Sequence, residues 1–131
     1  ELIRVESDGT ISFGDYTLGT KAKHTFQYEG ASYKVKTYKD ITKLECNGVF
    51  VYESVPGTAV SGFHKAEGKV TFRVEGLEDA QITLELEPET EYEITINEET
   101  AGTMKTNLGG KLSMSVELAE NASVAIVVEK R

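Results

Sequence analysis

The stretch "GTMKTNLGGKLSMS", from Gly102 to Ser115, carries paired glycines followed by a lysine, which are residue types of a phosphate-binding loop. Such a loop follows the pattern G-x-x-x-x-G-K-[ST] and leads into a helix, whose N-terminus holds the phosphate. Here Lys105 stands where the first glycine is required, and Leu112 stands where serine or threonine is required. Because apolar and polar residues alternate after Gly110, a strand is predicted there, and we reject the phosphate-site interpretation.

The paired glycines are instead interpreted as the corner of a β-hairpin. A three-residue loop, 107–109, pairs Met104 with Leu112 and keeps both side chains on the core face. This register predicts a positive φ at Gly109, because the third loop residue of such a turn is left-handed. It also predicts that the side chain of Lys111 lies in solvent.

Neither histidines nor nucleophile motifs indicate catalysis. The two histidines are His24, in an alternating run, and His64, at an expected strand end near a turn. No G-x-S-x-G sequence occurs. The 22 acidic residues mostly alternate outward on expected strands, and so short a chain has little spare length for a glycosidase cleft. We therefore predict no catalytic residue and no cofactor, with a small enzyme as the least favoured alternative.

Metal sites are not predicted either. No D-x-[DN]-x-[DN]-G calcium loop occurs, and a single cysteine cannot supply the thiolates of a structural zinc site. Two acidic pairs remain as alternatives for a structural calcium ion: Glu78 with Asp79, and Glu85 with Glu93. Cys46 ends the alternating run "TKLEC", so it is interpreted as a small core residue rather than a reactive thiol.

A row of lysine and tyrosine forms the best candidate binding surface. In "SYKVKTY", Val35 sets the inner face, so Lys34, Lys36 and Tyr38 face outward together. An exposed aromatic ring can pack on the C–H face of a sugar, and polar neighbours can bind its hydroxyls. We therefore predict these three residues as ligand-binding. The alternative is an ordinary exposed row whose lysines discourage edge pairing.

The elements that must position these residues are strands, because period-two alternation dominates the chain and no segment holds a helical apolar stripe. Asn47-Gly48 predicts a tight hairpin turn, and "VFVYESV", apolar on both faces, predicts a central strand covered on both sides. A loop of residues 98–100 is expected before the strand Thr103–Thr106. Many short strands with glycine-rich turns indicate a β-sandwich or a barrel. The other expected strands are Leu2–Glu6, Thr10–Phe13, Tyr16–Leu18, His24–Tyr28, Ser32–Tyr38, Thr42–Cys46, Val49–Val55, and residues 69–76, 80–87, 91–97, 111–118 and 123–130.

The segment "LEPETEY" has the pattern L-x-P-x-T-x-Y, with Leu86, Pro88, Thr90 and Tyr92 at the named positions. It resembles the corner of fibronectin type III domains, where the chain passes from one sheet to the other and a tyrosine hydroxyl bonds back to the backbone. The run after it is also similar to Ig-like accessory modules of bacterial secreted and polysaccharide-acting proteins. The resemblance implies an all-β, Ig/fibronectin III-like antiparallel β-sandwich with almost no helix.

A plain hairpin is the rival interpretation of "LEPETEY". It would place Glu85 opposite Glu93, and like charges directly opposite each other are unfavourable, which favours the crossover. The resemblance covers at most residues 56–131, and two further strands follow its expected last strand. We expect one domain, 1–131, with a possible subdivision into an N-terminal β extension, 1–55, and the sandwich, 56–131.

The charge distribution narrows the class of partner. The net charge of −8 argues against nucleic acid, which needs a positive surface, and no run of 18 apolar residues occurs. Residues 75–100 carry ten acidic and no basic residues, whereas residues 21–43 carry six lysines. The two regions are either solvated faces or the poles of a module that docks on a charged partner.

The location of the protein is expected to be extracellular or on a cell surface, although one unpaired cysteine also fits the cytoplasm. From Glu1 onward no charged-then-apolar leader occurs, so any signal peptide is expected to have been removed or never present. Asn121-Ala122-Ser123 matches the glycosylation pattern, which matters only in a eukaryotic secreted protein.

The leading hypothesis for function is a non-catalytic accessory or binding module of a larger bacterial surface or secreted protein, in contact with polysaccharide or a protein partner. The alternative is a structural module that joins copies or partners through its charge asymmetry or its open strand edges.

Overall fold

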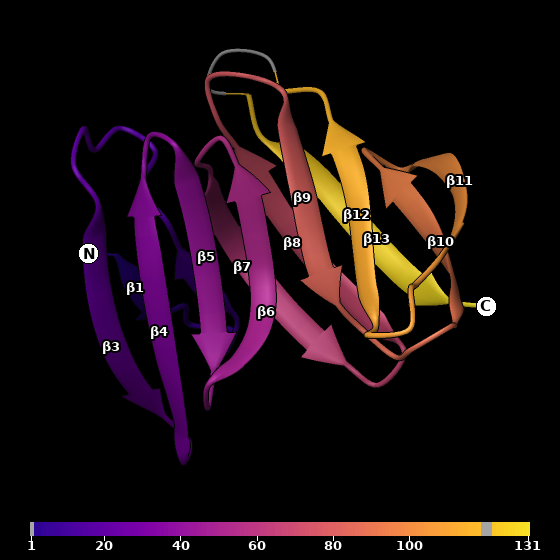
Figure 1. Ribbon diagram of the computed structural model, residues 1–131, viewed down its shortest axis with the longest axis horizontal. Helices are drawn as coiled ribbons and strands as arrows, with labels where there is room; N and C mark the ends of the chain where they lie inside the picture. The colour runs from indigo at the N-terminus through magenta and orange to yellow at the C-terminus, as the bar shows by residue number, and fades with distance from the viewer. Residues whose placement is uncertain (1, 119–121) are drawn as a thin grey trace.

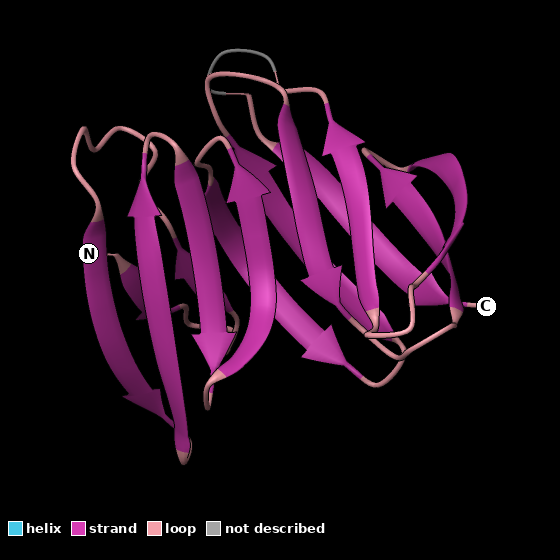
Figure 2. Cartoon of the chain, viewed as in Figure 1, coloured by secondary structure: helices cyan, strands magenta, loops and turns pink. Residues whose placement is uncertain are grey.

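The computed structural model describes residues 2–118 and 122–131, and strands make up 64% of it. The strands form two antiparallel sheets packed face to face, and no helix occurs in the residues described (Figures 1 and 2). The predicted all-β sandwich is therefore confirmed. Asn121, the first residue of the glycosylation pattern, lies outside the described residues.

Both sheets are fully antiparallel within this part of the chain. Sheet A has, in spatial order, the strands β1 (Ile3–Val5), β2 (Ile11–Phe13), β7 (Ala59–Ala66), β8 (Lys69–Glu75), β13 (Val124–Lys130), β10 (Glu91–Ile96) and β11 (Glu99–Lys105). Sheet B has β12 (Lys111–Val116), β9 (Ala80–Glu85), β6 (Val49–Val55), β5 (Ile41–Cys46), β4 (Ala31–Tyr38) and β3 (Ala22–Tyr28). Strands from the first 55 residues thus extend both sheets.

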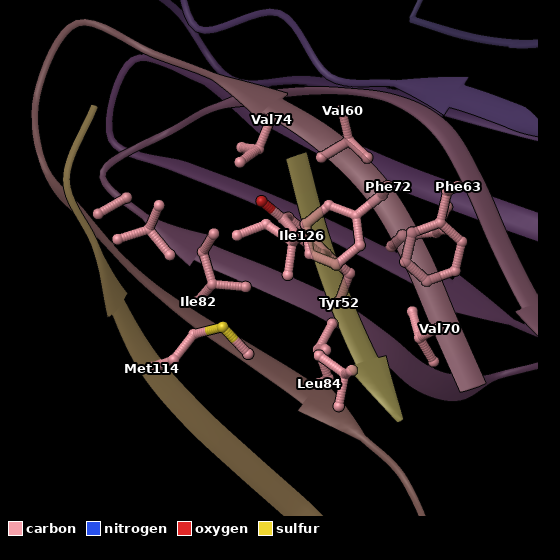
Figure 3. Packing of buried hydrophobic residues seen from close by; sticks show 14 of the residues in the cluster. Tyr52, Val60, Phe63, Val70, Phe72, Val74, Ile82, Leu84, Met114 and Ile126 are labelled. Atoms are coloured by element: carbon pink, nitrogen blue, oxygen red, sulfur yellow. The ribbon is translucent and has the colours of Figure 1, made fainter. Parts of the chain in front are cut away.

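The hydrophobic core lies between the two sheets, where the inward rows of the alternating strands meet (Figure 3). Tyr52 of sheet B stands edge-on to two rings of sheet A, with centroids 5.3 Å from Phe13 and 5.8 Å from Phe72. Such edge-to-face pairs are favoured by the aromatic quadrupole. Val70, Phe72 and Val74 face inward, as their alternation predicts.

A cluster of hydroxyl groups is also buried in the core. The hydroxyls of Tyr52 and Ser54 lie 2.8 and 2.7 Å from the hydroxyl of Thr58. The Thr42 hydroxyl donates to the Thr58 carbonyl at 2.8 Å and lies 2.8 Å from the Thr37 hydroxyl. Because each buried hydroxyl has a partner, the cluster avoids the desolvation penalty of an unpaired polar group.

Two strand predictions in the first half of the chain are wrong. Residues 16–18, expected as a strand, form a turn, because the Asp15 carboxylate accepts the backbone N–H of Thr17 at 2.9 Å. Strand β7 was expected only as a strand end at His64, because a register shift between Ser61 and His64, with Gly62 at φ 64°, breaks its alternation.

The "LEPETEY" corner is a crossover between sheets, since β9 belongs to sheet B and β10 to sheet A; the hairpin alternative is wrong. The backbone N–H of Glu87 donates to the Tyr92 hydroxyl at 3.2 Å, which is the predicted bond back to the upstream backbone. The buried Thr106 hydroxyl donates to the Glu87 carbonyl and accepts the N–H of Thr90 at 2.9 Å. The side chains of Tyr92 in β10 and of Thr106, the residue that follows β11, therefore fix the corner.

The paired glycines do not form the predicted hairpin. Met104 lies in sheet A and Leu112 in sheet B, so the chain crosses between sheets here. The positive φ occurs at Gly110, at 84°, and not at Gly109. A Cβ atom on Gly110 would lie 2.3 Å from the carbonyl oxygen of Leu86. Glycine is required there because two crossovers pack backbone against backbone.

Turns account for the remaining differences. Asn47-Gly48 forms the predicted hairpin, with φ values of 52° and 79° and Cys46 paired with Val49. The loop expected at residues 98–100 is instead a two-residue turn, Asn97-Glu98, and a register shift follows it between β10 and β11. Strand β6 is central in sheet B, but its outer face is not covered, because sheet B has no layer on that side.

Candidate functional site

The predicted binding residues occupy the outer face of β4. Val35 is buried against the core, so Lys34, Lys36 and Tyr38 point away from it, as the alternation predicts. The Lys34 side chain is exposed, whereas Lys36 and Tyr38 are half-buried among their neighbours. Their strand lies inside sheet B, between β3 and β5.

The two hairpins that flank β4 bring further lysines beside it. Lys23 of β3 lies directly opposite Lys36, and Lys43 of β5 lies opposite Lys36 on the other side. We call Lys23, Lys36 and Lys43 the lysine row. Three neighbouring strands thus present ammonium groups at one level of the sheet, with strands about 4.8 Å apart.

Acidic compensation of the lysine row is confined to Lys43, which Glu53 of β6 faces directly across the strand pair. Glu45 lies opposite Lys34, and its carboxylate is 3.5 Å from the Lys43 ammonium group. Partial burial, reinforced by the charges of neighbouring lysines, lowers the pKa of Lys36 below its usual range. The face therefore carries excess positive charge on a chain whose net charge is −8.

A shallow hollow of about 60 Å³ lies between these side chains, lined by Lys23, Lys34, Lys36, Lys43 and Glu45. Its lining is polar and its size suits one small anionic group rather than a whole sugar ring. Ammonium groups that converge on a carboxylate or sulfate form charge-assisted hydrogen bonds, which are stronger than neutral ones.

The aromatic rings on this face are engaged by cations. The ammonium group of Lys21 lies 5.8 Å from the ring centroid of Tyr38. Phe50 has two such neighbours, Lys111 at 4.8 Å and Lys43 at 5.8 Å. Because these contacts are cation–π interactions, they hold ammonium groups over the rings and extend the positive face beyond the lysine row.

Lys111 differs from its prediction. It is half-buried and forms an ion pair with Glu85 rather than lying free in solvent. The crossover at "LEPETEY" separates Glu85 from Glu93, which lie in different sheets. The Asp79 carboxylate accepts the backbone N–H of Leu118 at 3.0 Å. In the part of the chain that the structure describes, no three metal-ligating side chains come together.

A larger cavity lies elsewhere, at the end of the sandwich where the β3–β4 and β5–β6 turns meet the β1–β2 turn. Its volume is about 510 Å³. Tyr33 and Cys46 lie in its wall, and burial, with the neighbouring Cys46 as a second cause, raises the pKa of Tyr33. Cys46 is half-buried in the wall of this cavity, beside Tyr33. The lining residues include Ile11, Tyr28, Tyr33, Cys46, Phe63 and His64.

The two histidines are not brought together. His24 lies on β3 in sheet B and His64 on β7 in sheet A, and both are exposed. Of the two histidines, only His64 lines the cavity at the end of the sandwich.

The residues that the structure describes contain no helix that could span a membrane.

Sequence reasoning missed Lys23 and Lys43, although the signal for both was present. Two-residue turns at Glu29-Gly30 and Lys39-Asp40 fix the two hairpin registers. Each register then places one lysine opposite Lys36 by counting outward from the turn. The contacts of Phe50, in contrast, depend on a register shift between β5 and β6 that no turn signal marks.

Comparisons of the chain with protein-family models, with curated proteins and with solved structures found no match.

Proposed function

We propose that the chain is a non-catalytic binding module whose outer sheet B face contacts an acidic polysaccharide. The observation that carries the proposal is the lysine row, with three ammonium groups in direct cross-strand register. A secreted or cell-surface parent protein, implied by the fibronectin III-like resemblance, would present this face to such a polymer.

The lysine row is unfavourable for the isolated fold. Like charges directly opposite each other cost about 0.2–1 kcal/mol per pair, and the row contains two such pairs. Edge protection explains a lysine on β3, which is an edge strand, but not Lys36 and Lys43 on interior strands. Solubility does not explain them either, because lysines lower the magnitude of the net charge on an acidic chain. A negatively charged ligand would remove the repulsion.

The spacing of the row favours a polymer over a single anion. Lys23 and Lys43 are two strands apart, which corresponds to roughly 10 Å. This is about the length of two sugar residues, so the carboxylates of successive residues of a uronate polymer would meet successive lysines. Lys21 and Lys111, which lie over the rings of Tyr38 and Phe50, extend the positively charged face beyond the lysine row.

The test is affinity electrophoresis in gels that contain polygalacturonate, a uronate polymer, or a neutral glucan. We expect retardation by the uronate polymer only, and its loss as salt rises from about 0.05 to 0.5 M, because surface charges are screened. The double variant K36Q/K43Q is expected to bind about tenfold more weakly.

A matched control is K69Q/K105Q, which removes the same charge from exposed positions of sheet A. It is expected to bind like the wild-type chain. Equal retardation by the neutral glucan, or equal weakening by the two double variants, would contradict an acidic polysaccharide ligand on this face.

A further inference from the structure

Strand β12 presents an unprotected edge. Sheet A ends in β1, which has three residues, and in β11, whose register shift and Gly102 at φ 108° curl it away. Sheet B ends in β3, which carries Lys23, and in β12, whose outward side chains Ser113 and Ser115 are neutral. Among the four edges that the structure describes, β12 lacks the brevity or bulge that discourages pairing, and its one charged strand residue, Lys111, is ion-paired with Glu85 of its own copy.

A groove runs along the free edge of β12. It consists of two hollows of about 270 and 360 Å³ that share Ile96, Ala101 and Ser115 in their linings. The groove exists because β11 curls away from β12 at this end of the sandwich (Figure 1). Met104, 37% exposed, lines it together with Ile94 and Ile96. A strand added to β12 would place its inward side chains against these apolar groups.

We propose that this edge binds β3 of a second copy of the chain, so that sheet B continues from one molecule to the next. The directions of the strands fit this arrangement. Sheet B has six strands in strict antiparallel alternation, so its first strand, β12, and its last, β3, run in opposite directions (Figure 1). Two copies placed side by side in the same orientation therefore bring β3 and β12 together as an antiparallel pair.

Side chains select one register for the pair. The inward row of β3 must continue the inward row of β12, which is satisfied when Phe26 lies opposite Met114. Phe26 is half-buried in its own copy and would cover the apolar groove of the next. In this register Lys23 faces Glu117 on the outer side of the extended sheet.

The other positions agree with the same register. Glu29 falls opposite Lys111, Thr25 opposite Ser115, and Gln27 opposite Ser113. Opposite charges across a strand pair stabilise it, and hydroxyl pairs do so too. A shift by two residues in either direction breaks both the Glu29 contact with Lys111 and the contact between Lys23 and Glu117.

The resulting contact joins two different edges, so it is heterologous and does not close on itself. Copies would add one after another, and the twist of the sheets would turn the chain of copies into a helical filament. The contact shares Lys23 with the lysine row, whereas Lys36 and Lys43 lie on interior strands outside it, so K36Q/K43Q weakens polysaccharide binding without changing the contact.

Charge reversal tests the register. We expect sedimentation velocity to show wild-type oligomers that grow with protein concentration up to about 1 mM. The single variants K23E and E117K should each raise the concentration of half-assembly about tenfold, and K23E/E117K should restore it. The matched control K69E changes the same charge on sheet A and should have no effect. Far-UV circular dichroism confirms that each variant is folded.

Cross-linking tests the pairing directly and leaves all charges in place. In a C46S background, the variants T25C and S115C are mixed under mild oxidation, and a disulfide is expected between copies because opposite residues lie within bonding reach. A mixture of T25C and S61C, whose serine is exposed on sheet A, should not cross-link. A monomer at every concentration, a closed dimer, failure of the double charge reversal to restore assembly, or equal cross-linking in the two mixtures would each overturn the proposal.

Discussion

Replacement of Gly110 by alanine should destabilise the fold far more than replacement of its neighbour Gly109. Gly110 has φ 84°, and a Cβ atom there would lie 2.3 Å from the backbone oxygen of Leu86. Gly109 has no positive φ, and its nearest neighbour would be a side-chain oxygen of Asn107 at 3.5 Å. The two positions are adjacent in sequence and differ in both respects that penalise a side chain.

The magnitude follows from two contributions. A non-glycine residue in the left-handed region costs about 1–2 kcal/mol. Relief of the clash must move the two crossovers apart, which strains or breaks the hydrogen bond from the Leu86 N–H to the Gly110 carbonyl, 2.7 Å long and worth about 1 kcal/mol. We expect G110A to lose about 3 kcal/mol of unfolding free energy. G109A should stay within about 0.5 kcal/mol of the wild-type value, or gain slightly through a less flexible unfolded chain.

Urea unfolding followed by far-UV circular dichroism measures the difference. With a slope of about 2 kcal/mol per M, a loss of 3 kcal/mol lowers the midpoint by about 1.5 M. The slope itself should stay unchanged, because the same surface is exposed in both variants. Equal midpoints for G110A and G109A would refute the inference that close backbone packing, rather than loop flexibility, requires glycine at residue 110.

Three further predictions concern hydroxyl groups. Y92F removes the acceptor of the Glu87 N–H at the crossover and should cost about 1 kcal/mol in urea unfolding; no loss would mean that this bond is not formed in solution. T58V leaves the buried hydroxyls of Ser54 and Tyr52 without their shared partner and should cost about 2–3 kcal/mol, whereas T25V on the exposed β3 should have little effect. Burial raises the pKa of Tyr52 well above its usual range, so the folded state keeps a proton that the unfolded state releases. Unfolding free energy should therefore fall from about pH 10 upward, by up to about 1.4 kcal/mol per pH unit, and more steeply in the wild-type chain than in Y52F.

The sheets could be predicted from sequence wherever alternation was regular. Strands β8, β9, β10, β12 and β13 follow their alternating runs closely, because one inward row packs on one core. The "LEPETEY" crossover could also be predicted, since Tyr92 needs a polar partner when buried and like charges disfavour the hairpin.

Local pattern failed where a non-local contact decides the conformation. Gly109 and Gly110 are equally suited to a left-handed turn, and only the approach of Leu86 from another part of the chain selects Gly110. Most of strand β7 was missed because its bulge at Gly62 interrupts the period of two. At the candidate site, alternation predicted Lys34, Lys36 and Tyr38, whereas the lysine row needed two hairpin registers in addition.

The three lysines of the row differ in whether their strand lies at the edge or in the interior of sheet B. Lys23 lies on an edge strand, where a charge discourages indiscriminate pairing but can also select a partner with an acid at one position. Lys36 and Lys43 lie on interior strands, where no edge needs protection, and Lys36, which faces a lysine on each side, adds repulsion to the fold. If the row serves an anionic ligand, K36Q should raise stability by a few tenths of a kcal/mol while it weakens ligand binding. A gain in stability together with weaker ligand binding would identify Lys36 as a binding residue. If Lys36 served only the fold, K36Q would lower stability and ligand binding together.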